Sequence, residues 1–370
     1  MQIQTLSSIG ISLIKNNKAT TFADKVLKWF DLHGRHNLPW QKNINPYRVW
    51  VSEIMLQQTQ VKTVIPYFNA FMQSFPNVKA LADAGQDEVL KHWSGLGYYA
   101  RARNMHEAAK SVRDDFKGEF PQDLDTMLSL KGIGRSTAAA ILSIASNQPE
   151  PILDGNVKRV LSRVFAVEGW PGKSDVLQKL WLITEQTTPA TRNADYTQAI
   201  MDLGATVCTR SKPQCAICPL RDDCIANKDG RQSEFPGKKA KKTLPEREAI
   251  MLILKNPEHA VFMQKRPPVG IWGGLWCFPQ FEKMQHAEQW LHDFSETGLE
   301  ITEELAILSH TFSHFRLHIQ PLIVHLKTPI NLSVMEKDDS LWYNINTEFN
   351  GGLAAPVTTL LNTLVSRNKG

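Results

Sequence analysis

The hydrophobic and polar positions of this chain follow a helical period over its first half. Between about Thr21 and Leu203, apolar residues recur at three- and four-residue spacing between Gly and Pro breaks, as expected for a series of amphipathic helices. The run at 157–165 shows this best. Its apolar stripe consists of Val157, Val160, Leu161, Val164 and Phe165, and the residues between are Lys158, Arg159, Ser162 and Arg163. We expect this helix to pack by its stripe and to turn its basic groups to solvent.

The second half of the chain has the texture of strands instead. Short apolar runs at 249–254, 260–266 and 317–326 predict β-strands, and a helical pattern lies near 287–296. Between residues 229 and 246 the sequence is polar, basic and interrupted by Pro and Gly, which is typical of a linker. The predicted organisation is a disordered tail over 1–20, a mostly α-helical domain over 21–228, the linker over 229–246 and an α+β domain over 247–370.

Composition places the chain among soluble globular proteins. Its hydrophobic content of 42% and charged content of 21% are ordinary, and no apolar run approaches the roughly 20 residues needed to cross a bilayer. No signal peptide is recognisable, so a cytoplasmic location is expected. The net charge of +5 is compatible with a nucleic-acid partner but is also common among proteins that bind no DNA.

The cysteines predict a metal site. Four of the five fall within 17 residues, namely Cys208, Cys215, Cys218 and Cys224, whereas Cys277 stands apart. Four thiolates this close in the sequence can surround a zinc ion or an iron–sulfur cluster, and their spacing alone does not distinguish the two. Because protein then occupies every ligand position, we expect a structural site rather than a catalytic one.

Two further features suit contact with DNA phosphates. Gly132 and Gly134 precede a helical run and, with the helical segment before them, predict a helix-hairpin-helix whose backbone N–H groups approach an anion closely. Arg210 and Lys212 lie between the first two cysteines, on a loop that the metal would hold rigid. The alternatives at this point are a turn that merely connects two helices and loop charges that are simply solvated.

Two carboxylates are candidates for acid–base chemistry. Asp154 precedes the helix at 157–165, where it would cap the helix and be held ionised by N–H groups and the helix dipole. Glu53 follows a helix start at Asn45-Pro46 and lies among apolar neighbours, which would raise its pKa by desolvation. The pair could divide the roles of general acid and charge stabiliser, as in glycoside hydrolysis. A plain N-cap and a surface glutamate are the alternatives.

Amide and aromatic groups beside these segments are candidates for entering a base stack. Gln57, Gln58 and Thr59 follow the helix of Glu53, and Tyr98 lies in the glycine-flanked segment GLGYYARAR. An enzyme that acts on a base inside a duplex must extrude the nucleotide, and a side chain must fill the gap it leaves. A packed loop residue is the alternative for Tyr98.

Taken together, these segments resemble a known family. Over roughly residues 30–224 the chain is similar to the helix-hairpin-helix and Gly/Pro-Asp glycosylase superfamily, and within it to the MutY family of adenine DNA glycosylases. The similarity is carried by the stretches LPW, VSEIMLQQTQV, GLGYYARARN, GIGRSTAAAI, LDGNVKRVL, MDLGA and the cysteine loop. The resemblance implies a four-iron four-sulfur cluster, a nucleoid-associated monomer that binds duplex DNA, and hydrolytic removal of adenine paired with 8-oxoguanine or guanine.

The resemblance also implies roles for individual residues. Glu53 would protonate adenine at N7 and later activate water, Asp154 would stabilise the oxocarbenium ion, and Asn156 would help to hold the pair. The positions that match the family's adenine pocket are Trp40, Gln41 and Gln198. Some relatives carry Arg where Gln41 stands and Glu where Gln198 stands, so the chain departs from them there.

The identity of one hairpin residue separates two activities. In bifunctional enzymes of the endonuclease III type, the hairpin supplies a lysine that forms a Schiff base with the sugar. Here that substrate-binding position is Ser136, so we expect base removal without efficient backbone cleavage. A bifunctional glycosylase-lyase acting on oxidised pyrimidines and a non-catalytic DNA-binding module are the alternatives.

The C-terminal half is similar to the NUDIX-related domain with which the family recognises 8-oxoguanine. The segments RPPVGIWGGLWCFPQF at 266–281 and HTFSHFRL at 310–317 carry this similarity. By this match Phe312, Ser313 and His314 form the lesion-reading loop, while an ordinary strand end is the alternative. The residues expected to enter the stack on the lesion side are Gln57, Gln58 and Tyr98. Where a NUDIX hydrolase has an acidic cluster for Mg²⁺, AEQWLHDF stands instead, so no pyrophosphatase activity is expected.

Overall fold

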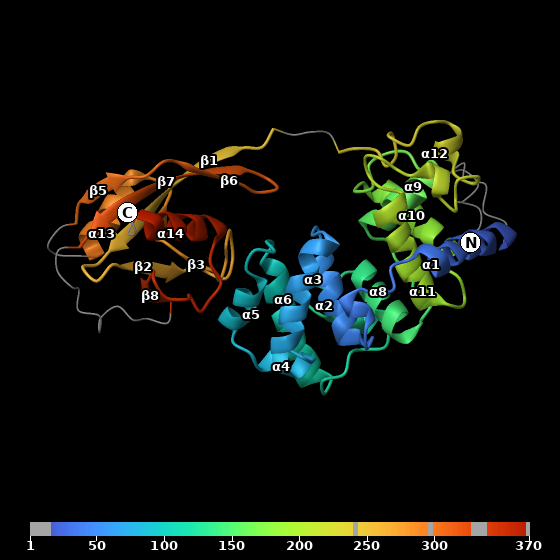
Figure 1. The fold of residues 1–370 in the computed structure, drawn as a ribbon, viewed down its shortest axis with the longest axis horizontal. Coiled ribbons are helices and arrows are strands. Elements are labelled where there is room, and N and C mark those ends of the chain that lie inside the picture. The colour runs from blue at the N-terminus through green and yellow to red at the C-terminus, as the bar shows by residue number, and fades with distance from the viewer. Residues whose placement is uncertain (1–15, 240–242, 295–298, 327–338, 368–370) are drawn as a thin grey trace. The chain divides into compact units, whose positions relative to one another are not determined.

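The computed structural model describes residues 16–239, 243–294, 299–326 and 339–367 (Figure 1). The chain folds into two compact units. The first contains residues up to 82 and residues 107–240, and the second combines residues 83–106 with residues 241–370. The segment 83–106, expected inside the helical domain, therefore groups with the C-terminal part of the chain.

The first unit is helical. Its elements are α1 (Asn16–His33), η2 (Pro39–Gln41), α2 (Pro46–Leu56), α3 (Val61–Ser74), α4 (Val78–Asp83), α7 (Leu124–Ser129), α8 (Arg135–Ser146), α9 (Gly155–Val164), α10 (Ser174–Thr187), α11 (Asn193–Asp202), η3 (Leu203–Val207), η4 (Cys215–Ile217) and α12 (Ile225–Lys228). α6 (Ala100–Asp115) contributes residues to both units. Among the described helices, none is both long and apolar enough to span a bilayer.

Local sequence explains where two of these helices begin. α2 begins directly after Asn45, whose side-chain oxygen accepts a hydrogen bond from the Arg48 N–H at 3.0 Å. α9 begins directly after Asp154, whose carboxylate accepts from the Val157 N–H at 2.7 Å. Both starts confirm the helix N-termini predicted from the sequence.

α8 is the central helix of the first unit. Its residues from Thr137 to Ile144 are all buried, and both α2 and α11 pack against it. A helix that is buried on every face requires other helices around it. Trp50 on α2, with Phe68 and Phe71 on α3, is completely buried and adds the largest side chains to this core.

The tail expected over residues 1–20 needs a partial correction. α1 begins at Asn16, so residues 16–20 belong to a helix, while residues 1–15 lie outside the described residues. The helix is anchored one turn later by the buried side chains of Phe22 and Val26. Because adding a residue to an existing helix costs far less than nucleating one, the helix extends beyond its first buried turn.

The second unit is an α+β fold, as the sequence predicts. Its elements are α5 (Gln86–Trp93), β1 (Glu246–Lys255), β2 (Ala260–Lys265), β3 (Trp276–Cys277), β4 (Gln280–Phe281), α13 (Met284–Phe294), β5 (Ile301–Glu304), β6 (Leu308–Thr311), β7 (Arg316–His325), β8 (Ser340–Asn344) and α14 (Ala355–Arg367). β1 pairs in parallel with β7 and antiparallel with β2 and β4. β2 also pairs with β3 and β8, and β7 with β5 and β6. The three strands predicted from apolar runs are confirmed as β1, β2 and β7.

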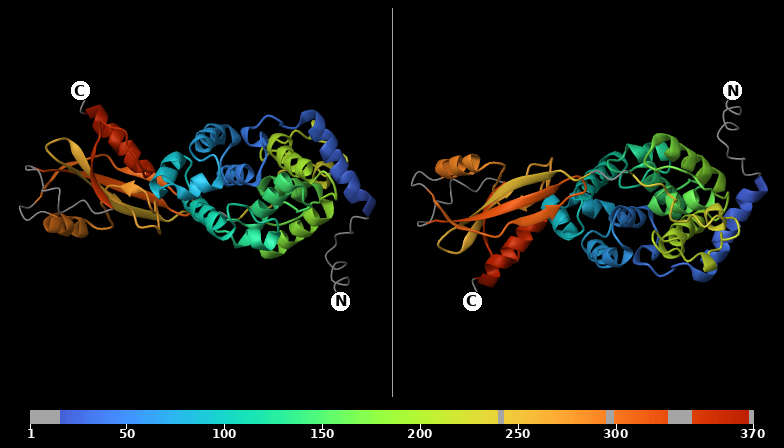
Figure 2. Two further views of the ribbon diagram at one scale, coloured as in Figure 1. Left: turned by 90° about the horizontal axis from the view of Figure 1, so that it is seen from below. Right: turned by 90° about the horizontal axis from the view of Figure 1, so that it is seen from above.

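Helices cover both faces of this mixed sheet. Figure 2 shows α13 and α14 on opposite sides of the strands. A strand covered on both faces loses the alternation of polar and apolar residues. In agreement, residues 251–255 of β1 and 321–324 of β7 are buried without interruption. α13 also confirms the helix predicted near 287–296 as far as residue 294, after which residues 295–298 lie outside the described part.

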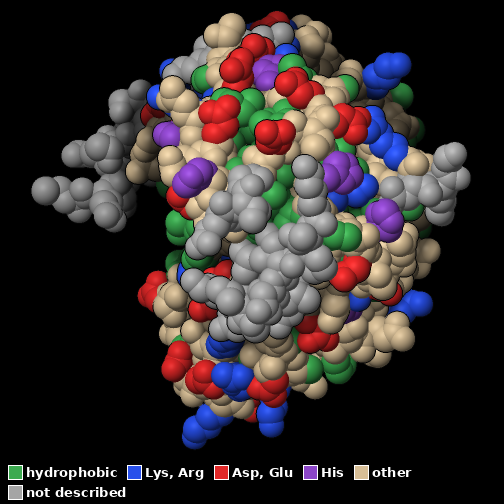
Figure 3. All heavy atoms as spheres, turned by 90° about the vertical axis from the view of Figure 1, so that its left-hand side faces the viewer, with side chains coloured by type: hydrophobic (Ala, Val, Ile, Leu, Met, Phe, Trp, Pro, Cys, Tyr) green, Lys and Arg blue, Asp and Glu red, His purple; other side chains and the backbone are tan. Residues whose placement is uncertain are grey.

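The outer side of α13 and the neighbouring β5 is acidic. Figure 3 shows Asp and Glu side chains gathered over the upper part of this end of the unit. Glu288 and Asp293 on α13, with Glu303 and Glu304 on β5, are exposed. Because like charges repel, this end of the unit is unsuited to binding a polyanion.

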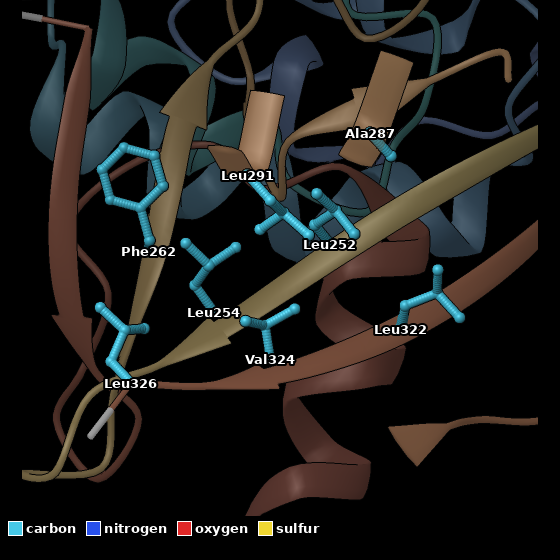
Figure 4. Packing of buried hydrophobic residues seen from close by; sticks show 8 residues of the cluster. All are labelled: Leu252, Leu254, Phe262, Ala287, Leu291, Leu322, Val324 and Leu326. Carbon is cyan, nitrogen blue, oxygen red and sulfur yellow. The ribbon is translucent and has the colours of Figure 1, made fainter. Parts of the chain in front are cut away.

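The apolar core of the second unit lies beneath α13 (Figure 4). Leu252 and Leu254 of β1 and Leu322 of β7 are completely buried there, against Ala287 and Leu291 of α13. Burying a leucine side chain contributes about 1.5–3 kcal/mol. This cluster therefore fixes the sheet on which the loops of the second unit are carried.

Candidate active site

Glu53 on α2 has strongly perturbed acid–base properties. Burial of its carboxyl group, and secondarily the negative charge of Asp154, raises the pKa of Glu53 to about 8. Over the described part of the chain, no hydrogen bond or ion pair stabilises the ionised form. The rise in pKa predicted from the apolar neighbours is confirmed, and the contribution of Asp154, the N-cap of α9, shows that its charge lies near enough to act on Glu53.

Asp154 occupies a different environment at the N-terminus of α9. Its carboxylate accepts hydrogen bonds from the Val157 N–H at 2.7 Å and from Asn156 Nδ2 at 3.1 Å. Burial nevertheless raises its pKa, and these hydrogen bonds and the Arg159 charge oppose that rise without cancelling it. The predicted N-cap is present and lowers the pKa of Asp154, although burial has the larger effect. Of the two carboxyls, only Asp154 has donors arranged for an anion, so the proton of the pair belongs on Glu53.

A chain of hydrogen bonds connects Asp154 to the cysteine loop. Arg159 Nη2 donates to Asn156 Oδ1 at 2.8 Å, and Arg159 Nε donates to the Cys208 carbonyl at 2.7 Å. The backbone of Gly204 approaches Asn156 so closely that an added Cβ would lie 2.6 Å from the Asn156 Cβ. The role of Arg159 was not predicted from the sequence, although its position three residues after Asn156 places the two side chains on the same face of α9.

Arg163 on α9 corrects a prediction. It was expected to face solvent, but its side chain is only 3% exposed. Its guanidinium donates to the Thr209 carbonyl at 2.7 Å, to the Arg210 carbonyl at 3.1 Å and to Cys208 Sγ at 3.3 Å. It also donates to two carbonyls of the chain after the last cysteine. The cysteine loop covers this face of α9, and Arg163 satisfies backbone carbonyls that burial would otherwise leave without donors.

The four clustered cysteines line one cavity. They are Cys208, Cys215, Cys218 and Cys224, and the apolar walls come from Val160, Val164, Val207 and Leu220. Within the described residues, no three His, Cys, Asp or Glu side chains converge closely enough to hold a single metal ion. The four thiols are spread around the walls of a cavity and do not converge on one point. This arrangement fits a multi-atom cluster better than a single zinc ion.

Arg210 and Lys212 lie on the loop between the first two cysteines, and both side chains are exposed. The loop is held from within, because Thr209 Oγ1 donates to the Lys212 carbonyl at 2.7 Å and Arg163 binds the Arg210 carbonyl. The two cations therefore project from a fixed backbone, as the sequence predicts.

The hairpin formed by α7 and α8 has the predicted geometry. Gly132 adopts a positive φ of 81°, and Gly134 is the N-cap of α8 without a side chain to occupy the first N–H groups. Ser136, the second residue of α8, accepts a hydrogen bond from the Leu153 N–H at 3.2 Å. The hairpin is thereby tied to the segment that ends in Asp154.

The three predicted adenine-pocket residues lie on different elements, η2 and α11. Trp40 is buried with its ring edge-on to Phe68 at 5.5 Å. The Gln41 amide accepts from the Leu38 N–H and donates to the Arg35 carbonyl, so it is occupied in shaping its own turn. Gln198 is partly buried on α11. Among the described contacts, none joins these side chains to Glu53 or Asp154.

The two candidate stack-entering segments are both turns. Gln58 follows α2 with a positive φ of 59° and is exposed, and Thr59 Oγ1 donates to the Gln57 carbonyl at 3.3 Å. Tyr98, in the other unit, has a positive φ of 49° and remains 49% exposed. A large aromatic held in this uncommon conformation at the surface fits a binding role better than a packed loop residue.

The predicted lesion-reading residues occupy the tip between β6 and β7. Ser313 and His314 are exposed, whereas Phe312 is half-buried and stacks on Phe315 at 4.6 Å. Ser313 Oγ and His314 Nδ1 lie 3.4 Å apart. The tip therefore exposes two polar side chains above a pair of stacked phenylalanine rings.

Three family models match separate parts of the chain. Residues 51–186 match a superfamily described as HhH-GPD base excision DNA repair proteins. Residues 208–224 match the iron–sulfur binding domain of endonuclease III, and residues 249–363 match the NUDIX domain. These matches confirm the expected fold class and the prediction that the four cysteines bind an iron–sulfur cluster.

Whole-chain relatives agree with this division. The chain is 42% identical to the adenine DNA glycosylase of Buchnera aphidicola subsp. Acyrthosiphon pisum (strain APS), over 92% of this chain and 96% of that one. It is 33% identical to the adenine DNA glycosylase of Homo sapiens, over 85% of this chain and 69% of that one. A solved structure of a thermostable thymine-DNA glycosylase superposes with a TM-score of 0.51 at 24% identity, covering 58% of this chain and 98% of that one, which shows a shared fold.

Proposed function

The chain belongs to the family of adenine DNA glycosylases, and from this premise we propose that its substrate is adenine paired with 8-oxoguanine or guanine in duplex DNA. We also propose that it releases the base and leaves the backbone uncut. The observation that carries the proposal is the contrast between two carboxyls: the pKa of Glu53 is near 8 and no described residue donates to it, whereas Asp154 accepts hydrogen bonds from Asn156 and Val157.

The two carboxyl groups then have different roles in the hydrolysis. Glu53 gives its proton to N7 of the extruded adenine, the C1′–N9 bond breaks, and the bonding electron pair leaves with the base. Asp154, fixed by Asn156 and the start of α9, stabilises the positive charge that develops on the sugar. Water then adds to C1′ and returns a proton to Glu53, which yields free adenine and an abasic site.

The hairpin supports a monofunctional reaction. A lyase step requires an amine that forms a Schiff base with C1′ of the sugar. Ser136 supplies a hydroxyl, and this hydroxyl is engaged with the Leu153 N–H beside Asp154. With no amine at this position, the reaction ends at the abasic site.

The protein is proposed to bind DNA as a monomer, through four groups of residues. The N–H groups at Gly132 and Gly134, together with Arg210 and Lys212, contact phosphates without reading sequence. The wedge residues are Gln57, Gln58, Thr59 and Tyr98, and the adenine-pocket residues are Trp40, Gln41 and Gln198. The tip at 312–314 reads the base opposite adenine.

The iron–sulfur cluster has a structural part in this proposal. Cys208, Cys215, Cys218 and Cys224 would hold it in the cavity that they line. Bound by these four thiolates, the cluster would hold in place the loop that carries Arg210 and that Arg159 and Arg163 bind. The loop in turn supports Asn156 and the catalytic carboxylate.

Single-turnover adenine release tests this function. We expect rapid release from an A:8-oxoguanine duplex, slower release from A:G and none from A:T, with strand scission only after alkali. Glu53→Gln should slow release by about 10²–10⁴-fold, whereas Glu168→Gln, which changes a carboxylate that is 79% exposed, should not change it. Efficient borohydride trapping of the protein on DNA would contradict the monofunctional mechanism, and undiminished release by Glu53→Gln would contradict the acid.

A further inference from the structure

The loop that follows β2, residues 266–274, contacts two parts of the second unit. One is the tip at 312–314, and the other is the pair of helices that flank Tyr98. Backbone hydrogen bonds join the two ends of the loop: the Arg266 N–H donates to the Leu275 carbonyl at 2.8 Å, and the Gly274 N–H donates to the Arg266 carbonyl at 3.1 Å. Trp272 within it has a positive φ of 56° although its ring is only 7% exposed. A tryptophan persists in that backbone conformation only where the surrounding contacts impose it.

One side of this loop supports the tip at 312–314. The Trp272 ring lies 5.5 Å from the His310 ring and 5.3 Å from the Phe312 ring, and those two rings are 4.6 Å apart. Phe312 in turn stacks on the buried Phe315. Rings at these distances pack against one another, so a shift of Phe312 toward the loop acts on Trp272 directly.

The other side of the loop contacts the helices that flank Tyr98. The Gly273 carbonyl accepts a hydrogen bond from Arg103 Nη1 at 2.5 Å, and an added Cβ on Gly274 would lie 3.5 Å from Leu90. Directly before the loop, Lys265 forms a 2.8 Å ion pair with Asp87 of α5.

The Tyr98 segment is itself tied to these helices. The Arg101 N–H donates to the Tyr98 carbonyl at 2.9 Å, and the Arg101 guanidinium lies 5.5 Å from the Tyr98 ring. The same guanidinium donates to the Gly97 carbonyl at 3.1 Å. Arg103, which binds the loop, is therefore half a turn beyond the residue that holds Tyr98.

We propose that the loop at 266–274 couples the tip at 312–314 to the Tyr98 segment, so that binding of the lesion base at the tip favours entry of Tyr98 into the stack. Trp272 and Arg103 are positioning residues in this scheme. Neither reads the lesion, yet both set how strongly the enzyme prefers 8-oxoguanine to guanine. The inference rests on the proposed function, because it takes the tip to be the lesion reader and Tyr98 to be the wedge.

The primary test compares excision rates on A:8-oxoguanine and A:G duplexes under single turnover, with the full-length protein. We expect Trp272→Ala and Arg103→Ala each to reduce the preference for 8-oxoguanine about fivefold or more, the lower end of coupling between two sites. Because the two residues lie on one route, the double variant should lose little beyond either single variant. Trp290→Ala, a loss of an aromatic from the core under α13, and Arg113→Ala, elsewhere on α6, should keep the preference.

A second measurement reads the wedge itself. With 2-aminopurine placed beside the 8-oxoguanine, wild-type protein should raise the fluorescence more than on the matching guanine duplex, and Trp272→Ala should lose that difference. Trp272→Phe should retain part of it, which separates lost coupling from misfolding. An unchanged preference in folded Trp272→Ala, or losses that multiply in the double variant, would overturn the inference. Absence of adenine release by wild type on every duplex would instead overturn the proposed function.

Discussion

In the first unit, the polar groups around Asp154 are partly buried and bonded to one another, whereas in the second unit Tyr98, Ser313 and His314 are exposed on turns. A reacting carboxylate needs surroundings of low dielectric constant and hydrogen-bond donors in fixed positions. Both must be in place before the substrate binds, so that no reorganisation is needed during the reaction. A wedge and a base reader must reach into DNA, so they lie outside the core and are positioned by the segments beneath them. Altering the first region should therefore affect chemistry and stability together, and altering the second should affect selectivity alone.

The largest expected effect is on chemistry at Glu53. Replacement by Gln keeps the size of the side chain but removes the transferable proton, so excision should slow by about 10²–10⁴-fold. Single-turnover rates on A:8-oxoguanine measure the loss, and gel-shift binding should stay near the wild-type level. A variant that loses binding and chemistry in proportion would show that Glu53 holds the substrate and does not protonate it.

The next effect is on the stability of the first unit. Arg163→Met should lower the free energy of unfolding of this unit by about 3 kcal/mol or more, because one buried and three partly buried carbonyls lose a donor, at about 1–3 kcal/mol for a buried one. Urea unfolding of the first unit and the iron content after dialysis measure the change. Arg221→Gln is the matched control, since Arg221 lies exposed on the same loop. Equal stability of the two variants would show that Arg163 is not needed to hold the loop.

The pH dependence gives a smaller effect with a definite sign. The proton required for catalysis is present on Glu53 below a pKa of about 8, so excision should fall about tenfold per pH unit above it. Folding also raises this pKa from its ordinary 4.5, so the folded protein binds the extra proton and the free energy of unfolding should fall as pH rises from 4.5 to 8. Glu53→Gln should flatten this part of the stability profile. A rate that rises through pH 8 would assign Glu53 as a base in the bond-breaking step.

The smallest effect on stability should come from the exposed tip. His314→Ala should change the free energy of unfolding by less than about 0.5 kcal/mol, because an exposed side chain has few contacts to lose. The same variant should lower the preference for 8-oxoguanine over guanine in excision. A destabilised variant with unchanged preference would reverse the contrast between the two regions.

Much of the local structure could be predicted from the sequence. The starts of α2 and α9 follow from Asn45 and Asp154 because a cap acts on N–H groups two or three residues away. The strands β1, β2 and β7 follow from apolar runs that only a covered sheet accommodates. The cysteine cluster follows from spacing, although spacing alone left the choice between zinc and an iron–sulfur cluster open.

The sequence by itself thus determined which residues cap helices, which apolar runs form strands and which cysteines cluster, since those properties depend on neighbours along the chain. The tertiary structure decided that Arg163 is buried, that burial outweighs the cap at Asp154, and that residues 83–106 pack with the C-terminal unit. Each of these depends on which distant segment excludes water from a given group. The hydrophobic period of α9 marked Arg163 as outward, but the covering loop begins 45 residues later and leaves no trace in that period.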